Sequence, residues 1–295
     1  IRYRKAMIAT GASPVVPGIP GLRESEPLTS DTIWDLTKLP ERLVVIGGGA
    51  IGCELGQAFS RLGSKVTLVE AAPRILSTLG KNVSELVMSR FEAEGITVMP
   101  RTTVTGVEGS ATDGNLVVVV DHETRIAADQ VLVAVGRRPN TANLNLNAVG
   151  VELTERGHVK VDDRLETTND HIYAGGDVIG KMPFTHTAGM HGGLVVSNAL
   201  FGLRRKADHE RIPYAIFCDP EVASVGRIRP NGDEELTVSH FDYEHLDRQV
   251  TTGEPVGFVD LFTDNKGHLV GATIVGDTAG ETINEMTARI LAGDK

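Results

Sequence analysis

Three glycines at fixed spacing are the first residues in this sequence whose pattern indicates chemistry. Gly47, Gly49 and Gly52 form a Gly-x-Gly-x-x-Gly motif directly after a run of four apolar residues. The first glycine of such a motif permits a tight turn, the second lets a pyrophosphate approach the backbone, and the third lets a helix pack closely on a strand. Ala50 and Ile51 would add free N–H groups at the helix N-terminus, which attract phosphate. The motif therefore predicts a dinucleotide site.

An acidic residue ends the next predicted strand. Glu70 closes the run Lys65-Val-Thr-Leu-Val-Glu70, 18 positions after Gly52. A carboxylate at this point accepts hydrogen bonds from the ribose 2′-hydroxyl of NAD and repels the 2′-phosphate of NADP. The sequence therefore predicts that NADH is preferred over NADPH. Arg74 either complicates this preference or lies on a solvated face.

Two further carboxylates have two interpretations each. Glu54 lies two positions after Gly52, where it either complements the helix dipole or contacts a nicotinamide or a nearby flavin. Asp177 follows the run Ile172-Tyr-Ala-Gly-Gly176. It either binds a ligand at the carboxyl end of a strand or caps the next helix.

Hydrophobic periodicity predicts the elements that position these residues. Leu43–Ile46 is a buried strand, residues 51–62 form a helix, and residues 65–70 form a second strand, which together make one βαβ unit. A helix over 83–94 and a strand over 96–99 follow. The sequence thus predicts a parallel sheet covered by helices.

After about residue 103 the pattern changes to short alternating strands. These form an antiparallel meander with a turn at Asp113-Gly114, and a buried strand over Val131–Val135 then ends in Gly136. The later predicted elements are a helix over 187–200, strands over 254–262 and 268–275, and a helix over 279–292. The last part of the chain is therefore an α+β piece.

A faint internal repeat links the start of the chain to this buried strand. Ala6–Pro14 resembles Val131–Pro139, and each copy is a buried strand that ends in Gly-x-x-Pro. The second copy closes the unit that begins with the glycine motif. We expect the first copy to close a sister unit whose glycine loop would lie upstream of Ile1.

Composition excludes several classes of protein. The chain has 295 residues, 41% hydrophobic, with 29 Lys and Arg against 39 Asp and Glu and a net charge of −10. This hydrophobic content allows a sizeable core and rules out wholesale disorder. The acidic balance argues against nucleic-acid or anionic-membrane surfaces. No run of 18 apolar residues predicts a membrane span, and no signal peptide is visible.

The cysteines and histidines indicate neither a disulfide framework nor a metal site. Cys53 and Cys218 are too far apart for a CxxC motif, and we expect two reduced cysteines in a cytoplasmic protein. A catalytic thiol at Cys218 would need a basic partner that the sequence does not show. His186 and His191 are five positions apart, without a carboxylate or cysteine to complete a metal site.

Several of these motifs occur in the same order in one family. The chain resembles the class I pyridine nucleotide-disulfide oxidoreductases, in particular the mercuric reductase and dihydrolipoamide dehydrogenase branch. The resemblance covers nearly the whole chain. The segments that carry it are Ala9-Thr-Gly-Ala-Ser-Pro14, Gly47-Gly-Gly-Ala-Ile-Gly-Cys-Glu54, Val135-Gly-Arg-Arg-Pro-Asn140, Tyr173-Ala-Gly-Gly-Asp177 and Asp219-Pro-Glu-Val-Ala-Ser-Val-Gly226.

The resemblance implies an α/β fold class with two Rossmann-like nucleotide-binding domains and an α+β C-terminal dimerisation domain. Residues 1–37 and 148–205 would belong to an incomplete FAD domain, residues 38–147 to a complete NAD-binding domain, and residues 210–295 to a truncated dimerisation domain. A homodimer is implied as well.

The resemblance also implies roles for single residues. Glu54 would support the nicotinamide, and Gly136 would lie along the bound NAD. Hydride would pass from NADH through flavin to a disulfide or metal-ion substrate, which is a small molecule. The residues implied to contact FAD are Thr10, Gly11, Arg137 and Asp177.

Three features of the family have no counterpart here. The first FAD glycine loop, the CxxxxC dithiol and the C-terminal His-x-x-x-x-Glu pair are absent, and the loop over Arg227–Glu235 is altered. We therefore expect a fragment with no catalytic residue of its own, whose parent protein binds FAD. Two alternatives remain: a non-catalytic NAD(H)-binding module, and a dithiol-less NADH oxidase or transhydrogenase.

Overall fold

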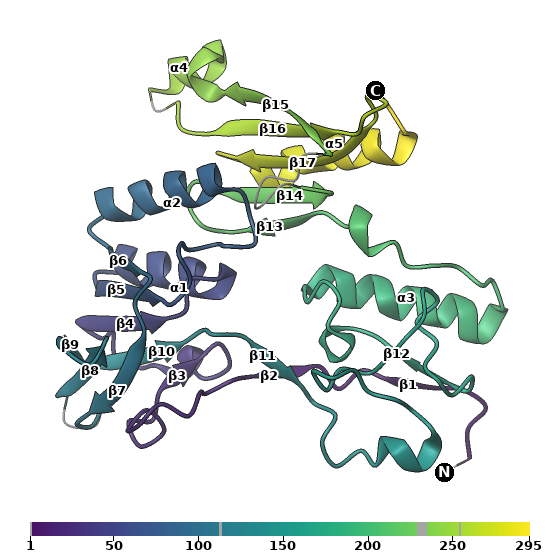
Figure 1. Cartoon of the computed structure of the whole chain (residues 1–295), viewed down its shortest axis with the longest axis horizontal. Helices are drawn as coiled ribbons and strands as arrows, with labels where there is room; N and C mark the ends of the chain where they lie inside the picture. Colours follow the sequence, from purple (N-terminus) through teal and green to yellow (C-terminus); the bar gives the residue numbers. More distant parts are fainter. Residues whose placement is uncertain (1, 112–113, 229–234, 254) are drawn as a thin grey trace. The chain divides into compact units, whose positions relative to one another are not determined.

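The computed structural model describes residues 2–111, 114–228, 235–253 and 255–295 (Figure 1). Contacts divide the chain into two compact units. Unit 1 consists of Ile1–Ser13 and Arg137–Ile212, and unit 2 consists of Pro14–Gly136 and Pro213–Lys295. The chain thus enters each unit twice.

The first part of unit 2 is built on a five-stranded parallel sheet in the order β3-β10-β4-β5-β6. Its central strands are nearly continuous apolar runs, as parallel strands buried on both faces require. Two helices, α1 and α2, connect strands on one side of this sheet. The bounds are β3 Leu28–Thr29, β4 Arg42–Ile46, α1 Ala50–Arg61, β5 Lys65–Glu70, α2 Lys81–Ala93, β6 Thr97–Pro100 and β10 Gln130–Val133.

Alternate side chains of this sheet enter two separate cores. Leu43 and Leu68 belong to the core that includes Val87 and Phe91 of α2. Side chains of the opposite face pack on an antiparallel three-stranded sheet of β7 (Val104–Glu108), β8 (Leu116–Val120) and β9 (Thr124–Ala128). The parallel sheet is therefore covered by α-helices on one face and by β-strands on the other.

The second part of unit 2 is a five-stranded antiparallel sheet in the order β13-β14-β17-β16-β15. Helix α5 contacts β13, β14 and β17 and buries Ile283 and Ile290 in their core. The Asp219-Pro220 bond between β13 and β14 is cis. The bounds are β13 Tyr214–Ile216, β14 Val222–Gly226, β15 Thr237–Asp242, α4 Asp247–Thr252, β16 Phe258–Thr263, β17 Leu269–Val275 and α5 Ala279–Ala292.

Unit 1 contains two short strand pairs and one long helix. Strands β1 and β12 pair in parallel, and β2 pairs with β11. Helix α3 supplies Val195 to a core that also includes residues of β12. The bounds are β1 Ala6–Ile8, β2 Ala12–Pro14, β11 Arg137–Pro139, β12 Ile172–Ala174 and α3 Thr185–Phe201.

Most predicted elements are present, with shifted ends. The helix predicted over 279–292 has these bounds, whereas the one predicted over 83–94 begins at Lys81 and ends at Ala93. The strand predicted to reach Val135 ends at Val133. The four domain ranges stay a prediction. Asp113 of the predicted Asp113-Gly114 turn and part of the altered 227–235 loop lie outside the described residues.

Among the helices of the described ranges, none has the length and apolar character to cross a membrane.

The assigned core of unit 2 predicts that two leucine substitutions will have very different effects on the free energy of unfolding. Leu68 in β5 is fully buried, so Leu68→Ala should lower the free energy of unfolding by about 2–5 kcal/mol through lost burial and a residual cavity. Leu62, directly after α1, is 67% exposed, and Leu62→Ala should change this free energy by about 0.5 kcal/mol or less. Urea unfolding followed by circular dichroism would measure both. Equal losses would contradict the assigned core.

Candidate functional site

The glycine motif forms the turn between β4 and α1. Gly47 has a φ of 109°, and a Cβ on it would collide with the Ala134 carbonyl. A Cβ on Gly52 would collide with the Gly47 carbonyl, so α1 packs against the strand end only because Gly52 has no side chain. Gly49 is different, because it caps α1 and faces open space. Two glycines are therefore required by packing, and the third leaves a backbone that a ligand can approach.

Gly136, which follows β10 at the same edge of the sheet, also faces open space. Its φ is 128°, which favours glycine, and no atom lies within 4 Å of where a Cβ would be. Ligands of parallel α/β sheets bind at the carboxyl ends of strands. The ends of β4 and β10 thus present bare backbone on the side where a nucleotide would bind.

Glu70 at the end of β5 is tied to the glycine loop. Its Oε2 accepts a hydrogen bond from the Gly48 N–H at 2.6 Å, and its Oε1 accepts one from the Ala72 N–H at 2.6 Å. Each carboxylate oxygen has a second lone pair, so Glu70 can still accept bonds from ribose hydroxyls. Arg74 donates to the carbonyls of Ser77 and Leu79, at 3.2 and 3.0 Å. These bonds hold its guanidinium in the loop before α2.

These features fit a dinucleotide. The open backbone at Gly49 leaves room for a pyrophosphate, and the first N–H groups of α1, including those of Ala50 and Ile51, have no partner within the helix. Glu70 supplies an acceptor for a ribose at the neighbouring strand end. Unit 2 therefore combines space for a pyrophosphate, a helix N-terminus that attracts it, and a carboxylate that can bind a ribose.

Glu54, in the first half of α1, contacts the chain just after β13. Its Oε1 accepts a hydrogen bond from the Phe217 N–H at 2.8 Å. Burial raises the pKa of the Glu54 carboxyl, and the Phe217 N–H opposes this shift. Glu54 thus does more than complement the helix dipole, because it joins the two parts of unit 2.

Gln57 makes the next contact along the same helix. Its Oε1 accepts from the Asp219 N–H at 2.7 Å, and its Nε2 donates to the Asp219 carbonyl at 2.8 Å. Gln57 is only 3% exposed. The side-chain amide therefore satisfies both backbone groups of Asp219 inside the protein.

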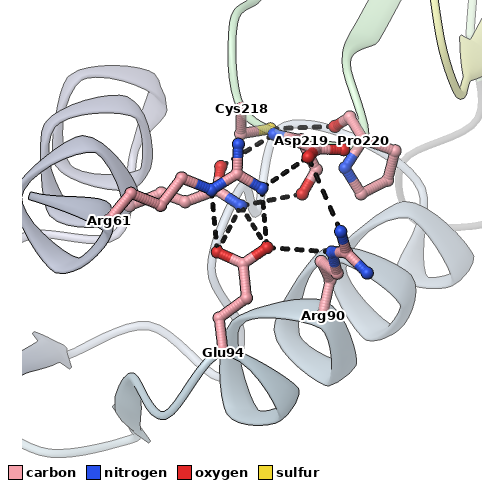
Figure 2. A network of polar contacts seen from close by, with 7 residues as sticks. Arg61, Arg90, Glu94, Cys218, Asp219 and Pro220 are labelled. Carbon is pink, nitrogen blue, oxygen red and sulfur yellow. Dashed lines mark hydrogen bonds and ion pairs between the residues drawn. The ribbon is translucent and has the colours of Figure 1, made fainter.

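A network of charges lies at the end of this contact (Figure 2). Arg61 pairs with the Asp219 carboxylate and with Glu94 at 2.7 Å, and Arg90 of α2 pairs with Glu94 at 2.9 Å. Hydrogen bonds from Arg61 hold the pKa of the Glu94 carboxyl below its usual value. Helices α1 and α2 thus share one acidic partner beside the cis-proline turn.

The predicted FAD residues lie in unit 1. Arg137 and Asp177 form an ion pair at 3.7 Å, and Arg137 Nη2 also donates to the Ala12 carbonyl at 2.5 Å. Thr10 donates its hydroxyl to the Asn140 carbonyl at 2.7 Å. The structure therefore brings Arg137 and Asp177 together, whereas Thr10, before β2, makes a separate contact with Asn140, after β11.

Asp177 follows β12 as the first residue of a 3₁₀ turn, Asp177–Ile179, whose N-cap is Gly176. The alternative that Asp177 caps the following helix is therefore wrong. Its carboxylate is 26% exposed at a strand end, and Gly11 faces open space with a φ of 68°. An accessible acceptor and an open backbone fit the hydroxyl-bearing chain of FAD.

His191 in α3 holds the backbone next to Asp177, a role that the sequence did not predict. Its Nδ1 accepts a hydrogen bond from the Gly176 N–H at 3.0 Å, so the ring proton lies on Nε2, 2.9 Å from His209 Nε2. His191 is fully buried, and burial lowers its pKa to about 4. Charge repulsion from His209 and Lys181 contributes to this lowering of the pKa.

His186 lies apart from this pair and stacks on Phe184. Within the described ranges no group of three or more His, Cys, Asp or Glu side chains could hold a metal ion. Cys53 and Cys218 are both free and buried, and burial raises the pKa of Cys218 to about 12. Neither thiol has the character of a nucleophile.

Comparisons with known proteins agree with this geometry. Residues 1–192 match the family described as pyridine nucleotide-disulphide oxidoreductase, and residues 212–293 match its dimerisation domain. A mercuric reductase from Bacillus cereus is 37% identical over 298 residues, which cover 99% of this chain and 47% of that protein. A dihydrolipoyl dehydrogenase from Bacillus subtilis (strain 168) is 36% identical over 299 residues, which cover 99% of this chain and 63% of that protein.

A solved structure shows the same fold. The Cu(II) complex of the HOCl-induced flavoprotein disulfide reductase RclA from Escherichia coli has a TM-score of 0.88 at 30% identity. The match covers 100% of this chain and 69% of that one. The mixed α/β fold with a dimerisation domain is therefore that of flavoprotein disulfide reductases. The chain spans about half the length of the first mercuric reductases that it matches.

The buried His191 predicts a loss of stability in acid. Above pH 6.5 the imidazole is neutral in both the folded and the unfolded chain, and it contributes no pH dependence. Between pH 6.5 and about 4 only the unfolded chain takes up the proton. The free energy of unfolding should therefore fall by about 3 kcal/mol over this range.

His191→Gln removes the titrating group and keeps an acceptor, so its stability should fall less steeply between these pH values. His186→Gln, in the same helix but without the Gly176 bond, is the matched control and should behave like the unmodified chain. Thermal unfolding at a series of pH values would measure all three. Parallel pH profiles for His191→Gln and the unmodified chain would contradict the role of His191.

Proposed function

The chain belongs to the pyridine nucleotide-disulphide oxidoreductase family, and from this premise we propose that it binds NAD(H) at the glycine loop of unit 2. The observation that carries the proposal is the combination of open backbone at Gly49 with the Glu70 carboxylate hydrogen-bonded to the same loop. In this proposal Gly47 and Gly52 shape the turn, the N–H groups of Ala50 and Ile51 face the pyrophosphate, and Gly136 lies along the cofactor.

Glu70 is proposed to select NADH over NADPH. Its carboxylate lies at the end of β5, beside the place where the ribose would bind, and it can accept hydrogen bonds from hydroxyl groups. A 2′-phosphate would bring negative charge against it. We expect NADH to bind at least tenfold more tightly than NADPH, a difference of about 1.4 kcal/mol.

Glu54 is proposed to face the nicotinamide end of the cofactor. It lies one turn into α1, past the helix end where the pyrophosphate would bind, and the Phe217 N–H fixes one of its oxygens. In the part of the chain that the structure describes, no hydrogen bond reaches the other oxygen, Oε2. That oxygen is available to accept a bond from a carboxamide.

The activity of the whole protein to which this chain would belong is proposed to be that of an FAD-dependent NAD(P)H oxidoreductase. FAD, when bound, supplies a group that takes hydride from NADH and passes electrons to a disulfide or a metal ion. Asp177 would accept bonds from the ribityl hydroxyls, Arg137 would hold Asp177 in place, and Thr10 and Gly11 would border the flavin. In this proposal the domains resemble those of the matched reductases. Residues 1–37 and 148–205 would form the FAD-binding part, residues 38–147 the NAD-binding part, and residues 210–295 the dimerisation part.

Exchange of Glu70 for a cation tests the nucleotide preference. Glu70→Arg removes the repulsion toward a 2′-phosphate, so the ratio of NADPH to NADH affinity should rise at least tenfold. Glu92→Arg makes the same charge change on an exposed part of α2 and should leave the ratio unchanged. Isothermal titration with each nucleotide would measure the four affinities. Equal affinities for NADH and NADPH in the unmodified chain would contradict the role of Glu70.

The match of residues 212–293 to a dimerisation domain supports a homodimer. We expect sedimentation equilibrium to give about twice the chain mass of 31.5 kDa at micromolar concentration, and dilution to shift the balance toward monomer. A mass equal to one chain at all concentrations would contradict the proposal.

A further inference from the structure

Three polar side chains form one stripe along α1. Glu54, Gln57 and Arg61 are three and four positions apart, so they lie on the same face of the helix. All three contact the segment 217–219: Glu54 through the Phe217 N–H, Gln57 through both backbone groups of Asp219, and Arg61 through the Asp219 carboxylate. The segment therefore runs along the helix that begins at the glycine loop.

We propose that Gln57, Arg61 and Asp219 are positioning residues of the NAD(H) site, which hold the segment 217–219 along α1 so that the Phe217 N–H fixes the Glu54 carboxylate. This inference rests on the function proposed above, in which Glu54 faces the nicotinamide. It adds that the geometry of Glu54 depends on residues that would touch no part of the cofactor.

Gln57 is the central contact of this arrangement. Its amide binds the N–H and the carbonyl of Asp219, and its Nε2 also donates to Glu94 Oε2 at 3.1 Å. Removal of this amide leaves two backbone groups of Asp219 without this partner, which destabilises their present position. Since Asp219 is only two residues from Phe217, a shift of Asp219 moves the N–H that holds Glu54.

Arg61 holds the same segment through charge. Its Nη2 binds Asp219, and its Nε binds Glu94 Oε2 at 3.1 Å, so the planar guanidinium bridges two carboxylates (Figure 2). Arg90 supports both acids, at 2.9 Å from Glu94 and 3.6 Å from Asp219. The carboxylate of Asp219 is thereby fixed in direction as well as in distance.

A comparison of two ligands distinguishes a positioning role from a general disturbance of the nucleotide site. NADH carries the nicotinamide, whereas ADP-ribose keeps the adenosine and pyrophosphate but lacks it. Gln57→Leu, Arg61→Gln and Asp219→Asn should each weaken NADH binding about tenfold and change ADP-ribose binding less than twofold, as isothermal titration would show. Lys81→Gln breaks the exposed Lys81–Glu85 pair of α2 without touching the segment, and it should change neither affinity.

Double variants that also carry Glu54→Gln test whether the three residues act on NADH binding through Glu54. If the three residues act through Glu54, their substitutions should add less than twofold to the loss of NADH affinity already caused by Glu54→Gln. Full additivity would overturn the proposal. Equal weakening of NADH and ADP-ribose would overturn it as well, since that pattern means a disturbed glycine loop.

Arg61 and Asp219 are partly exposed, with side chains 45% and 42% accessible, so their variants should fold even if Gln57→Leu does not. Unchanged NADH affinity in both of these variants would overturn the inference while ADP-ribose binding still supports the proposed function. If the unmodified chain binds neither ligand, the proposed function fails, and the inference fails with it.

Discussion

The close approach of Gly52 to the Gly47 carbonyl is the constraint on which the site depends. Any side chain at Gly52 would occupy the position of that carbonyl. Because Gly52 has no side chain, a turn of three residues, 47–49, is enough to join β4 to α1, and the open backbone of Gly49 lies at the N-terminus of the helix. One stripe of polar side chains on this helix, from Glu54 onward, contacts the segment after β13.

Glu70, at the end of the neighbouring strand β5, also holds the glycine loop in place. Its two oxygens bind N–H groups on either side, one in the glycine loop and one just after β5. The Gly47 N–H also binds the Val69 carbonyl at 2.9 Å, so the loop is attached to β5 by backbone and side chain together. In the function proposed here, the carboxylate that shapes the loop would also repel a 2′-phosphate, so one residue would have two roles. The electrostatics of the site are therefore built into the turn itself.

Local patterns predicted much of the fold and part of the site. The βαβ unit, the glycine motif and Glu70 lie within 28 residues, where apolar periodicity and spacing determine the local structure. The Gln57–Asp219 contact joins residues 162 positions apart, and the His191–Gly176 bond depends on how α3 packs on β12. Nothing in the local sequence distinguishes Gln57 from a polar residue on a helix surface. Such contacts are specified by tertiary packing, which periodicity does not report.

The contacts of the α1 stripe divide between a buried neutral group and exposed charges, and the two kinds contribute differently. Exposed ion pairs such as Arg61–Asp219 add about 0–1 kcal/mol to stability because water screens them. The Gln57 amide is buried, and an unsatisfied group there costs about 1–3 kcal/mol. A shift of the segment by one residue would leave Gln57 facing the wrong backbone groups. The amide thus fixes the register of the segment on α1, and the charges orient the side chain of Asp219 within that register.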